Sequence, residues 1–150
     1  METIETTSLE ETFAFGKQLA SRLRRGDCVA LIGDLGAGKT ALTRGVAIGL
    51  GLTQENMVSS PTFVLVQEYP ARVPVFHIDL YRMKQPELEL PSLGLDEMLQ
   101  EGVVLIEWAD RAPVALPRRH WRVEIAAIGP TARRIEVTAP AESERNTPCR

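Results

Sequence analysis

The stretch that decides the fold of this chain is Cys28-Val29-Ala30-Leu31-Ile32-Gly33-Asp34-Leu35-Gly36-Ala37-Gly38-Lys39-Thr40. Its first five residues are all apolar, which is typical of a strand buried on both faces of a parallel sheet. The next eight match the pattern G-x-x-x-x-G-K-[ST] in full. A helix-forming segment follows, so the glycine-rich residues connect a strand to a helix. This order predicts a phosphate-binding loop.

The residue types of this loop suit a nucleotide. Glycines let backbone N–H groups turn inward around phosphate oxygens, and the start of the following helix adds the positive end of its dipole. Lys39 would reach the outer phosphates, and the Thr40 hydroxyl would bind Mg²⁺. A glycine-rich turn that binds nothing rarely carries Lys-Thr after its last glycine. The residues expected to contact the nucleotide are therefore Gly33, Asp34, Leu35, Gly36, Ala37, Gly38, Lys39, Thr40 and Ala41.

The segments on either side predict a single α/β domain. Residues 8–26 predict a helix that Ser8 caps and Gly26 ends, and residues 39 to about 50 predict a second one. Strands are expected at 62–69, 73–79 and 103–107, with a further helix in the later part of 86–100. Residues 121–128 and 134–137 predict an antiparallel hairpin. The expected fold is a three-layer P-loop NTPase fold with a mostly parallel central sheet and an antiparallel C-terminal hairpin.

Length and charge exclude several classes of protein. The chain has 150 residues, enough for one domain, with 17 basic against 20 acidic side chains. A formal charge of −3 argues against a generally basic surface for nucleic acid or membrane lipids. The acidic start has no apolar core of a secretory signal, and two cysteines are too few for a disulfide framework. We expect a cytoplasmic domain over residues 1–140, with a polar, disordered tail at 141–150 and no membrane partner.

Two acidic residues end apolar strands and are candidates for the magnesium site. Residues 103–107 are four aliphatic residues followed by Glu107, and residues 75–79 end in Asp79. In an open parallel sheet, ligands lie beyond the carboxyl ends of the strands, so both acids could face the phosphate loop. We assign Glu107 to Mg²⁺, directly or through water. Asp79 could orient the attacking water or a magnesium-bound water.

A neighbouring loop and a histidine each have a functional and a structural interpretation. The loop Ser60-Pro61-Thr62 could sense a γ-phosphate or its Mg²⁺, or be a plain turn. His77 is more plausibly a packed or hydrogen-bonded strand residue than a metal ligand, because no cluster of ligating residues accompanies it.

The aromatic and basic residues beside the two acids are candidates for partner contacts or structural roles. Trp108 follows Glu107 and would point to the opposite face if the strand continued, into the core or onto a contact surface. Tyr81 and Arg82 would reach the rim of the site. Arg82 could then pair with phosphate, with an acid or with a partner.

Four segments together resemble one family. They are the loop Gly33 to Thr40, then Ser60-Pro61-Thr62-Phe63, then His77-Ile78-Asp79-Leu80-Tyr81-Arg82, then Glu107-Trp108. In this order and spacing they resemble the bacterial TsaE (YjeE) family over residues 5–139. The resemblance implies a small ATPase required for N6-threonylcarbamoyladenosine in tRNAs that read ANN codons. It would act with TsaD, the carbamoyl-transferring subunit, and TsaB. It would reset that complex between turnovers and contact tRNA only indirectly.

The resemblance also implies roles for individual residues. Lys39 and Thr40 would hold phosphate and magnesium, Glu107 would be the acid at the magnesium, and Asp79 would be required near the γ-phosphate. The segment Ser60-Pro61-Thr62 matches a switch-like loop, and the adenine would lie near Glu10 and Arg133. Ala41 departs from the family, which often has a second hydroxyl residue there, and Thr40 still supplies the magnesium hydroxyl.

Three other functions share the loop. A small-molecule kinase would need an acceptor pocket and a lid with arginines, and the one available insert, residues 85–100, is acidic and apolar. A GTPase normally carries N-K-x-D, which does not occur in this chain. A nucleotide-sensing subunit with negligible turnover of its own is a third alternative, because a partner could complete the geometry for attack by water.

Overall fold

The computed structural model describes residues 1–34, 38–53 and 66–141. The expected strand–loop–helix unit is present as β2 (Cys28–Ile32) and α2 (Lys39–Gly49). The other strands are β1 (Glu2–Thr6), β3 (Val66–Tyr69), β4 (Val75–Asp79), β5 (Val103–Glu107), β6 (Trp121–Ala127) and β7 (Arg133–Thr138). The other helices are α1 (Leu9–Ala20), α3 (Pro86–Glu89) and α4 (Leu95–Glu101), with single turns η2 (Pro91–Leu93), η3 (Ala109–Arg111) and η4 (Pro113–Ala115).

The strands form one mixed sheet in the order β1-β7-β6-β2-β5-β4-β3. Its four central strands, β6, β2, β5 and β4, run parallel. The outer strands pair antiparallel, β1 with β7 and β7 with β6 on one side and β3 with β4 on the other. The expected parallel centre and antiparallel C-terminal hairpin are therefore confirmed.

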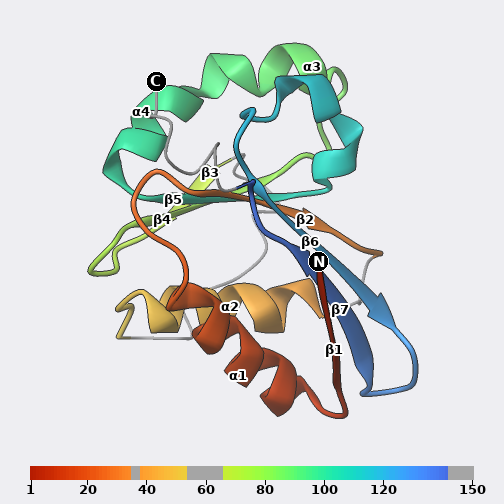
Figure 1. Ribbon diagram of the computed structural model, residues 1–150. Coiled ribbons are helices and arrows are strands. Elements are labelled where there is room, and N and C mark those ends of the chain that lie inside the picture. The colour runs from red at the N-terminus through yellow and green to blue at the C-terminus, as the bar shows by residue number, and fades with distance from the viewer. Residues whose placement is uncertain (35–37, 54–65, 142–150) are drawn as a thin grey trace.

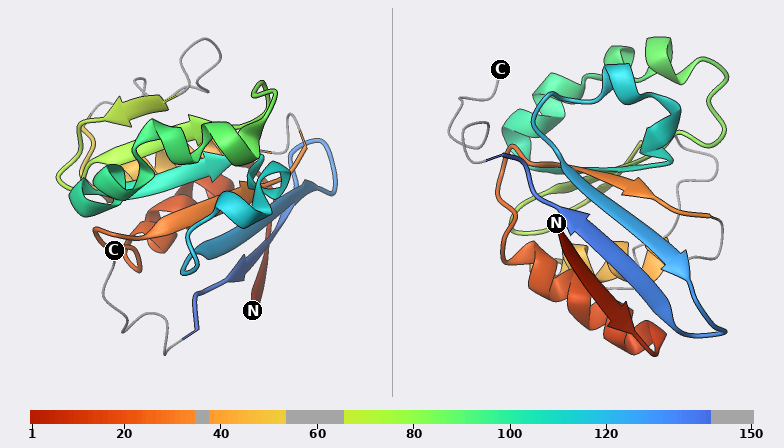
Figure 2. Two further views of the ribbon diagram at one scale, coloured as in Figure 1. Left: turned by 90° about the horizontal axis from the view of Figure 1, so that it is seen from above. Right: turned by 45° about the vertical axis from the view of Figure 1, so that its right-hand side comes forward.

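Helices cover the two faces of the sheet and make three layers. Helices α1 and α2 lie against one face, and the segment with α3, α4, η3 and η4 lies against the other (Figures 1 and 2). Each interface has its own cluster of buried apolar side chains. Strand β2 contributes to both: Val29 and Leu31 face the α1–α2 side, and Cys28 and Ala30 face the α4 side. Burial on both faces explains its continuous apolar sequence.

Helices α1 and α2 cross at two glycines. A Cβ placed on Gly16 would lie 2.5 Å from the Leu42 carbonyl oxygen, and one placed on Gly45 would lie 2.1 Å from the Phe13 carbonyl oxygen. No side chain fits between backbones at these distances. The crossing therefore fixes where α2 lies, and with it the position of Lys39 at the start of that helix.

Several expected boundaries differ from the structure. Helix α1 begins as predicted, because the Ser8 hydroxyl accepts a hydrogen bond from the Glu11 N–H. The prediction that it continues to Gly26 is wrong: it ends at Ala20, where the Ser21 hydroxyl bonds the Gln18 carbonyl. The sequence also gave no indication of strand β1, whose alternation is weak and whose partner β7 is distant in the chain.

Some expectations lie outside the described residues. These are the first part of the strand predicted at 62–69 and the tail after residue 141. Within the described residues, the helices are all too short or too polar to cross a membrane.

Candidate functional site

The site is built where three parallel strands end side by side. Leu31 of β2 pairs with Glu107 of β5, which in turn pairs with Asp79 of β4. The chain leaves β2 through Gly33 and Asp34 and enters α2 at Gly38, whose φ of 102° favours glycine. Both predicted acids thus lie beside the start of α2, as the rule for parallel sheets requires. Leu35, Gly36 and Ala37 lie outside the described residues.

Lys39 is buried at the centre of this arrangement. Its ammonium donates a hydrogen bond of 2.7 Å to the Gly33 carbonyl oxygen. It lies 3.8 Å from Glu107 Oε1 and 4.1 Å from the centroid of the Trp108 ring. Burial lowers the pKa of Lys39, and the negative charges of Glu107 and Asp79 act in the opposite direction. Anionic phosphate oxygens beside Lys39 would favour its charged form in the same way as these carboxylates do.

Trp108 does not follow the alternation of β5. The strand ends at Glu107, and Trp108 adopts a left-handed conformation with φ 58° and ψ 36°. A bulky residue rarely takes this conformation, and such strain is concentrated at functional sites. The strand does not continue, so the condition for the alternation is not met. The turn brings the indole ring over the Lys39 ammonium, and the side chain also packs against the buried cluster on the α4 side of the sheet. Tyr81, 43% exposed, stacks at 4.9 Å on the same ring.

Glu107 is 3% exposed and has a partner on each carboxylate oxygen. Oε1 faces Lys39, and Oε2 is hydrogen-bonded to His77 Nε2. On the other side of its ring, His77 Nδ1 lies 2.9 Å from the Tyr69 hydroxyl. The interpretation of His77 as a hydrogen-bonded strand residue agrees with this geometry. Tyr69, on β3, is a member of the site that sequence reasoning missed.

Asp79 is half-buried at the end of β4. Its Oδ1 accepts a hydrogen bond of 2.9 Å from the Tyr81 N–H. Burial raises the pKa of Asp79, the Tyr81 hydrogen bond opposes this, and the charge of Glu107 adds to it. Arg111 was not predicted and holds this segment, because its Nη1 donates to the carbonyl oxygens of Leu80 at 2.5 Å and Tyr81 at 2.8 Å.

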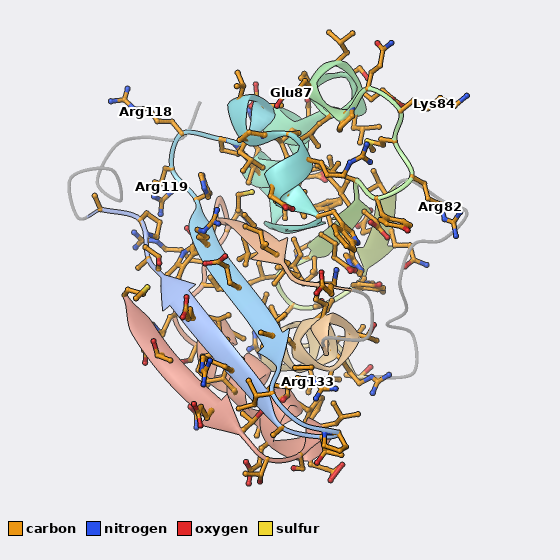
Figure 3. The ribbon with its side chains drawn as sticks, turned by 90° about the vertical axis from the view of Figure 1, so that its right-hand side faces the viewer. Arg82, Lys84, Glu87, Arg118, Arg119 and Arg133 are labelled. Carbon is orange, nitrogen blue, oxygen red and sulfur yellow. The ribbon has the colours of Figure 1, made fainter. Side chains whose placement is uncertain are left out.

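The other predicted residues surround this centre at different depths. Thr40 and Ala41 lie in the first turn of α2. Arg133 is buried beside Gly38: a Cβ on that glycine would lie 3.2 Å from Arg133 Nε. Glu10 is exposed in the first turn of α1, and Arg82 is exposed and projects from the edge of the molecule (Figure 3). Ser60, Pro61 and Thr62 lie outside the described residues.

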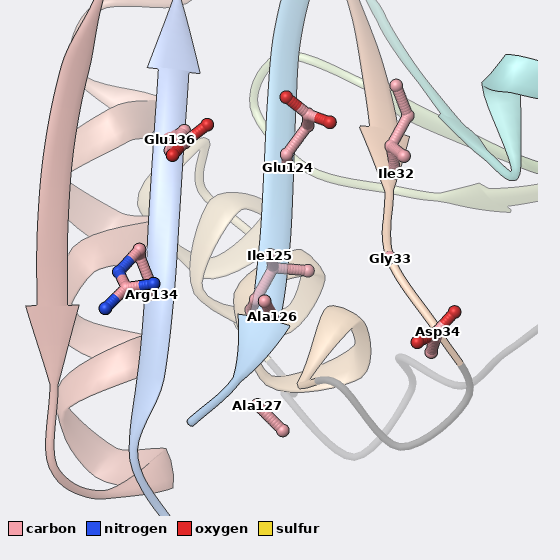
Figure 4. A pocket seen from close by; sticks show the side chains of 9 residues that line it. All are labelled: Ile32, Gly33, Asp34, Glu124, Ile125, Ala126, Ala127, Arg134 and Glu136. Atoms are coloured by element: carbon pink, nitrogen blue, oxygen red, sulfur yellow. The ribbon is translucent and has the colours of Figure 1, made fainter. Parts of the chain in front are cut away.

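A cavity of about 490 Å³ adjoins the phosphate loop on the exposed face of β6 and β7. Gly33 and Asp34 border it on one side, and Glu124, Arg134 and Glu136 on the other (Figure 4). Three of its four charged side chains are acidic, which disfavours phosphate.

The chain matches one protein family over most of its length. Residues 6–135 match the sequence model described as "Threonylcarbamoyl adenosine biosynthesis protein TsaE". The chain belongs to the TsaE family. The residues that carried the resemblance, from Gly33 to Trp108, all lie inside the matched range, and the family role is in tRNA threonylcarbamoyladenosine biosynthesis.

Individual members of the TsaE family support this assignment. The chain is 43% identical over 136 residues to the tRNA threonylcarbamoyladenosine biosynthesis protein TsaE of Bacillus subtilis, covering 89% of this chain and 83% of the relative. It is 40% identical over 134 residues to the protein of the same name from Streptomyces coelicolor, covering 85% and 89%. The crystal structure of YdiB from Bacillus subtilis superposes with a TM-score of 0.75 at 35% identity, covering 96% of this chain and 88% of that one.

The groups present in this TsaE-family chain fit a magnesium nucleotide. Mg²⁺ prefers hard oxygen ligands and is usually held by one or two carboxylates together with substrate phosphates and water. Glu107, Asp79 and the Thr40 hydroxyl are such ligands, and they lie around the start of α2. Lys39 adds a positive charge that would balance phosphate oxygens in a buried setting.

Proposed function

We propose that this chain is a Mg²⁺-dependent ATPase that serves threonylcarbamoyladenosine formation in tRNA together with TsaD and TsaB. The observation that carries the proposal is the pairing of Lys39, the first residue of α2, with the buried Glu107 at the end of β5, the strand beside β2. P-loop NTPases commonly use a lysine and an acid in these positions, beside a glycine-rich loop, to bind the outer phosphates and their metal.

The present contacts of Lys39 suggest how ATP would be held. The ammonium now donates to the Gly33 carbonyl and lies over the Trp108 ring. Phosphate oxygens would replace the carbonyl as acceptor, while the indole ring keeps water away from the ammonium. Thr40 and Glu107 would hold the Mg²⁺, which supplies positive charge to the developing transition state. Asp79, half-buried and free to accept at its second oxygen, would orient the attacking water.

An exposed aromatic side chain beside Lys39 supports the dependence on partners. Tyr81 is 43% exposed and packs against Trp108, so a partner that covers Tyr81 would also lie close to the outer phosphates. The family resemblance implies that TsaD and TsaB are this partner and that tRNA is contacted only indirectly, through their complex. The chain would then work in the cytoplasm, where these tRNAs are modified.

The first test measures Mg²⁺-ATP turnover by the purified chain, with and without the TsaD–TsaB pair and tRNA. We expect slow turnover alone and a large stimulation by the pair. Turnover of ~1–100 s⁻¹ by the isolated chain, in the range of kinases, would refute the dependence on partners. Transfer of phosphate to a small metabolite would point instead to a kinase.

The second test concerns the metal. Glu107→Ala should weaken ADP binding in the presence of Mg²⁺ much more than in EDTA, because the carboxylate acts through the metal. Glu68→Ala, an exposed acid on β3, is the matched control and should leave both affinities unchanged. An equal effect of Glu107→Ala with and without Mg²⁺ would remove Glu107 from the metal site.

A further inference from the structure

The two oxygens of Glu107 have separate partners. Oε2 is turned toward His77 Nε2, and Oε1 is turned toward Lys39 and the phosphate loop. The side chain is almost fully buried, and no bulk water is available to replace a lost hydrogen bond. A buried carboxylate oxygen without a donor is costly, so the contact with His77 fixes the orientation in which the carboxylate faces the nucleotide.

The imidazole ring of His77 is itself fixed from both sides. An ionised carboxylate has only acceptors, so the proton between Glu107 and His77 belongs to Nε2. The opposite nitrogen, Nδ1, lies 2.9 Å from the Tyr69 hydroxyl. His77 and Tyr69 are both buried, with exposed fractions of 1% and 2%. Strands β3, β4 and β5 thus each supply one member of a continuous hydrogen-bonded row.

We propose that His77 is a positioning residue that sets the orientation of Glu107 for Mg²⁺, with Tyr69 fixing the orientation of the His77 ring. The proposal rests on the proposed magnesium role of Glu107. His77 does not touch the metal in this arrangement, because both of its nitrogens are already engaged. Hydrogen bonds to a ligating carboxylate typically contribute ~10–100-fold to metal affinity or activity.

Three substitutions at His77 separate positioning from packing. His77→Gln keeps an N–H donor at the position of Nε2, whereas His77→Asn places its amide only as far as Nδ1. His77→Phe preserves the ring volume and has no donor. Phe76→Leu on the same strand is the control for loss of packing, since Phe76 faces the opposite cluster and lies away from Glu107. Each variant is titrated with ADP in Mg²⁺ and in EDTA, by calorimetry.

The expected pattern is selective. His77→Phe and His77→Asn should lose about 10-fold or more of the Mg²⁺-dependent gain in ADP affinity, with little change in EDTA. His77→Gln should retain most of that gain, and Phe76→Leu should retain all of it while unfolding at lower temperature. If His77→Phe does not fold, the contrast between His77→Asn and His77→Gln carries the test. Equal Mg²⁺ dependence in all the His77 variants would overturn the proposal.

Two further results separate this inference from the proposed function. If Glu107→Ala abolishes the Mg²⁺ dependence and His77→Phe does not, only the role of His77 is wrong. If neither substitution changes it, the magnesium role of Glu107 is wrong as well. In the free wild-type protein, long-range ¹H–¹⁵N NMR should show a proton on His77 Nε2, assigned against a His120→Gln variant. An unprotonated Nε2 would overturn the proposal without any nucleotide.

Discussion

Replacing Gly45 with alanine should destabilise the protein and displace the phosphate loop. A Cβ at this position would lie 2.1 Å from the Phe13 carbonyl oxygen and 3.0 Å from Gly16 Cα. Ordinary contacts begin near 3.4 Å, so the first distance falls short by about 1.3 Å. The obstacle is backbone within a helix, which cannot rotate aside as a side chain can. Helices α1 and α2 must therefore separate at their crossing.

The magnitude follows from two opposing effects. Overpacking of a core costs up to about 3 kcal/mol when the surroundings cannot yield. Alanine is favoured over glycine in a helix by about 1 kcal/mol. The net loss for Gly45→Ala is therefore about 2 kcal/mol. For a domain of this size, that loss lowers the melting temperature by about 4–8 °C.

Urea unfolding followed by circular dichroism measures the effect. Gly129→Ala is the control, because the nearest atom to its Cβ would be Ala132 Cβ at 3.5 Å, and its stability should change by less than about 0.5 kcal/mol. ADP affinity should fall in Gly45→Ala alone, since α2 carries Lys39. A Gly45→Ala protein as stable as the wild type would refute the close crossing of the two helices.

Three further predictions concern individual side chains. Burial raises the pKa of Asp79, so the charged carboxylate opposes folding at pH 7. Asp79→Asn should therefore stabilise the free protein at pH 7 by less than about 1 kcal/mol. The gain should disappear in acid, where Asp79 is protonated, and denaturant midpoints measured at pH 7 and in acid check this. Burial raises the pKa of Cys28 to about 12, so in a Cys149→Ser background a thiol reagent at pH 8 should label the chain only as fast as it unfolds. Ser8→Ala removes the cap on the Glu11 N–H and should cost about 1 kcal/mol in urea unfolding, and an unchanged midpoint would show that the cap contributes nothing.

The sequence predicted most of the elements because their signals are local. An apolar run such as Cys28–Ile32 between turn residues is typical of a strand buried on both faces, and Ser8 followed by Glu11 marks a helix start. Boundaries that depend on hydrogen bonds between distant segments were less predictable. Gly26 has the positive φ expected of a helix end, but its N–H bonds Gly102, far along the chain. Such a bond has no local signature.

By itself, the sequence determined the glycine-rich connection between β2 and α2, the two acids at strand ends and the family, because each depends on residue types at fixed spacing. The tertiary structure alone decided which side chains meet at Glu107. The order β2-β5-β4-β3 brings Lys39, Glu107, His77 and Tyr69 into one row, although they are spread from residue 39 to residue 107. Likewise, the left-handed turn at Trp108 ends strand β5 and places an indole over Lys39, a contact that strand alternation does not predict. Strand order and a single strained turn arise from packing of the whole chain, which no local pattern encodes.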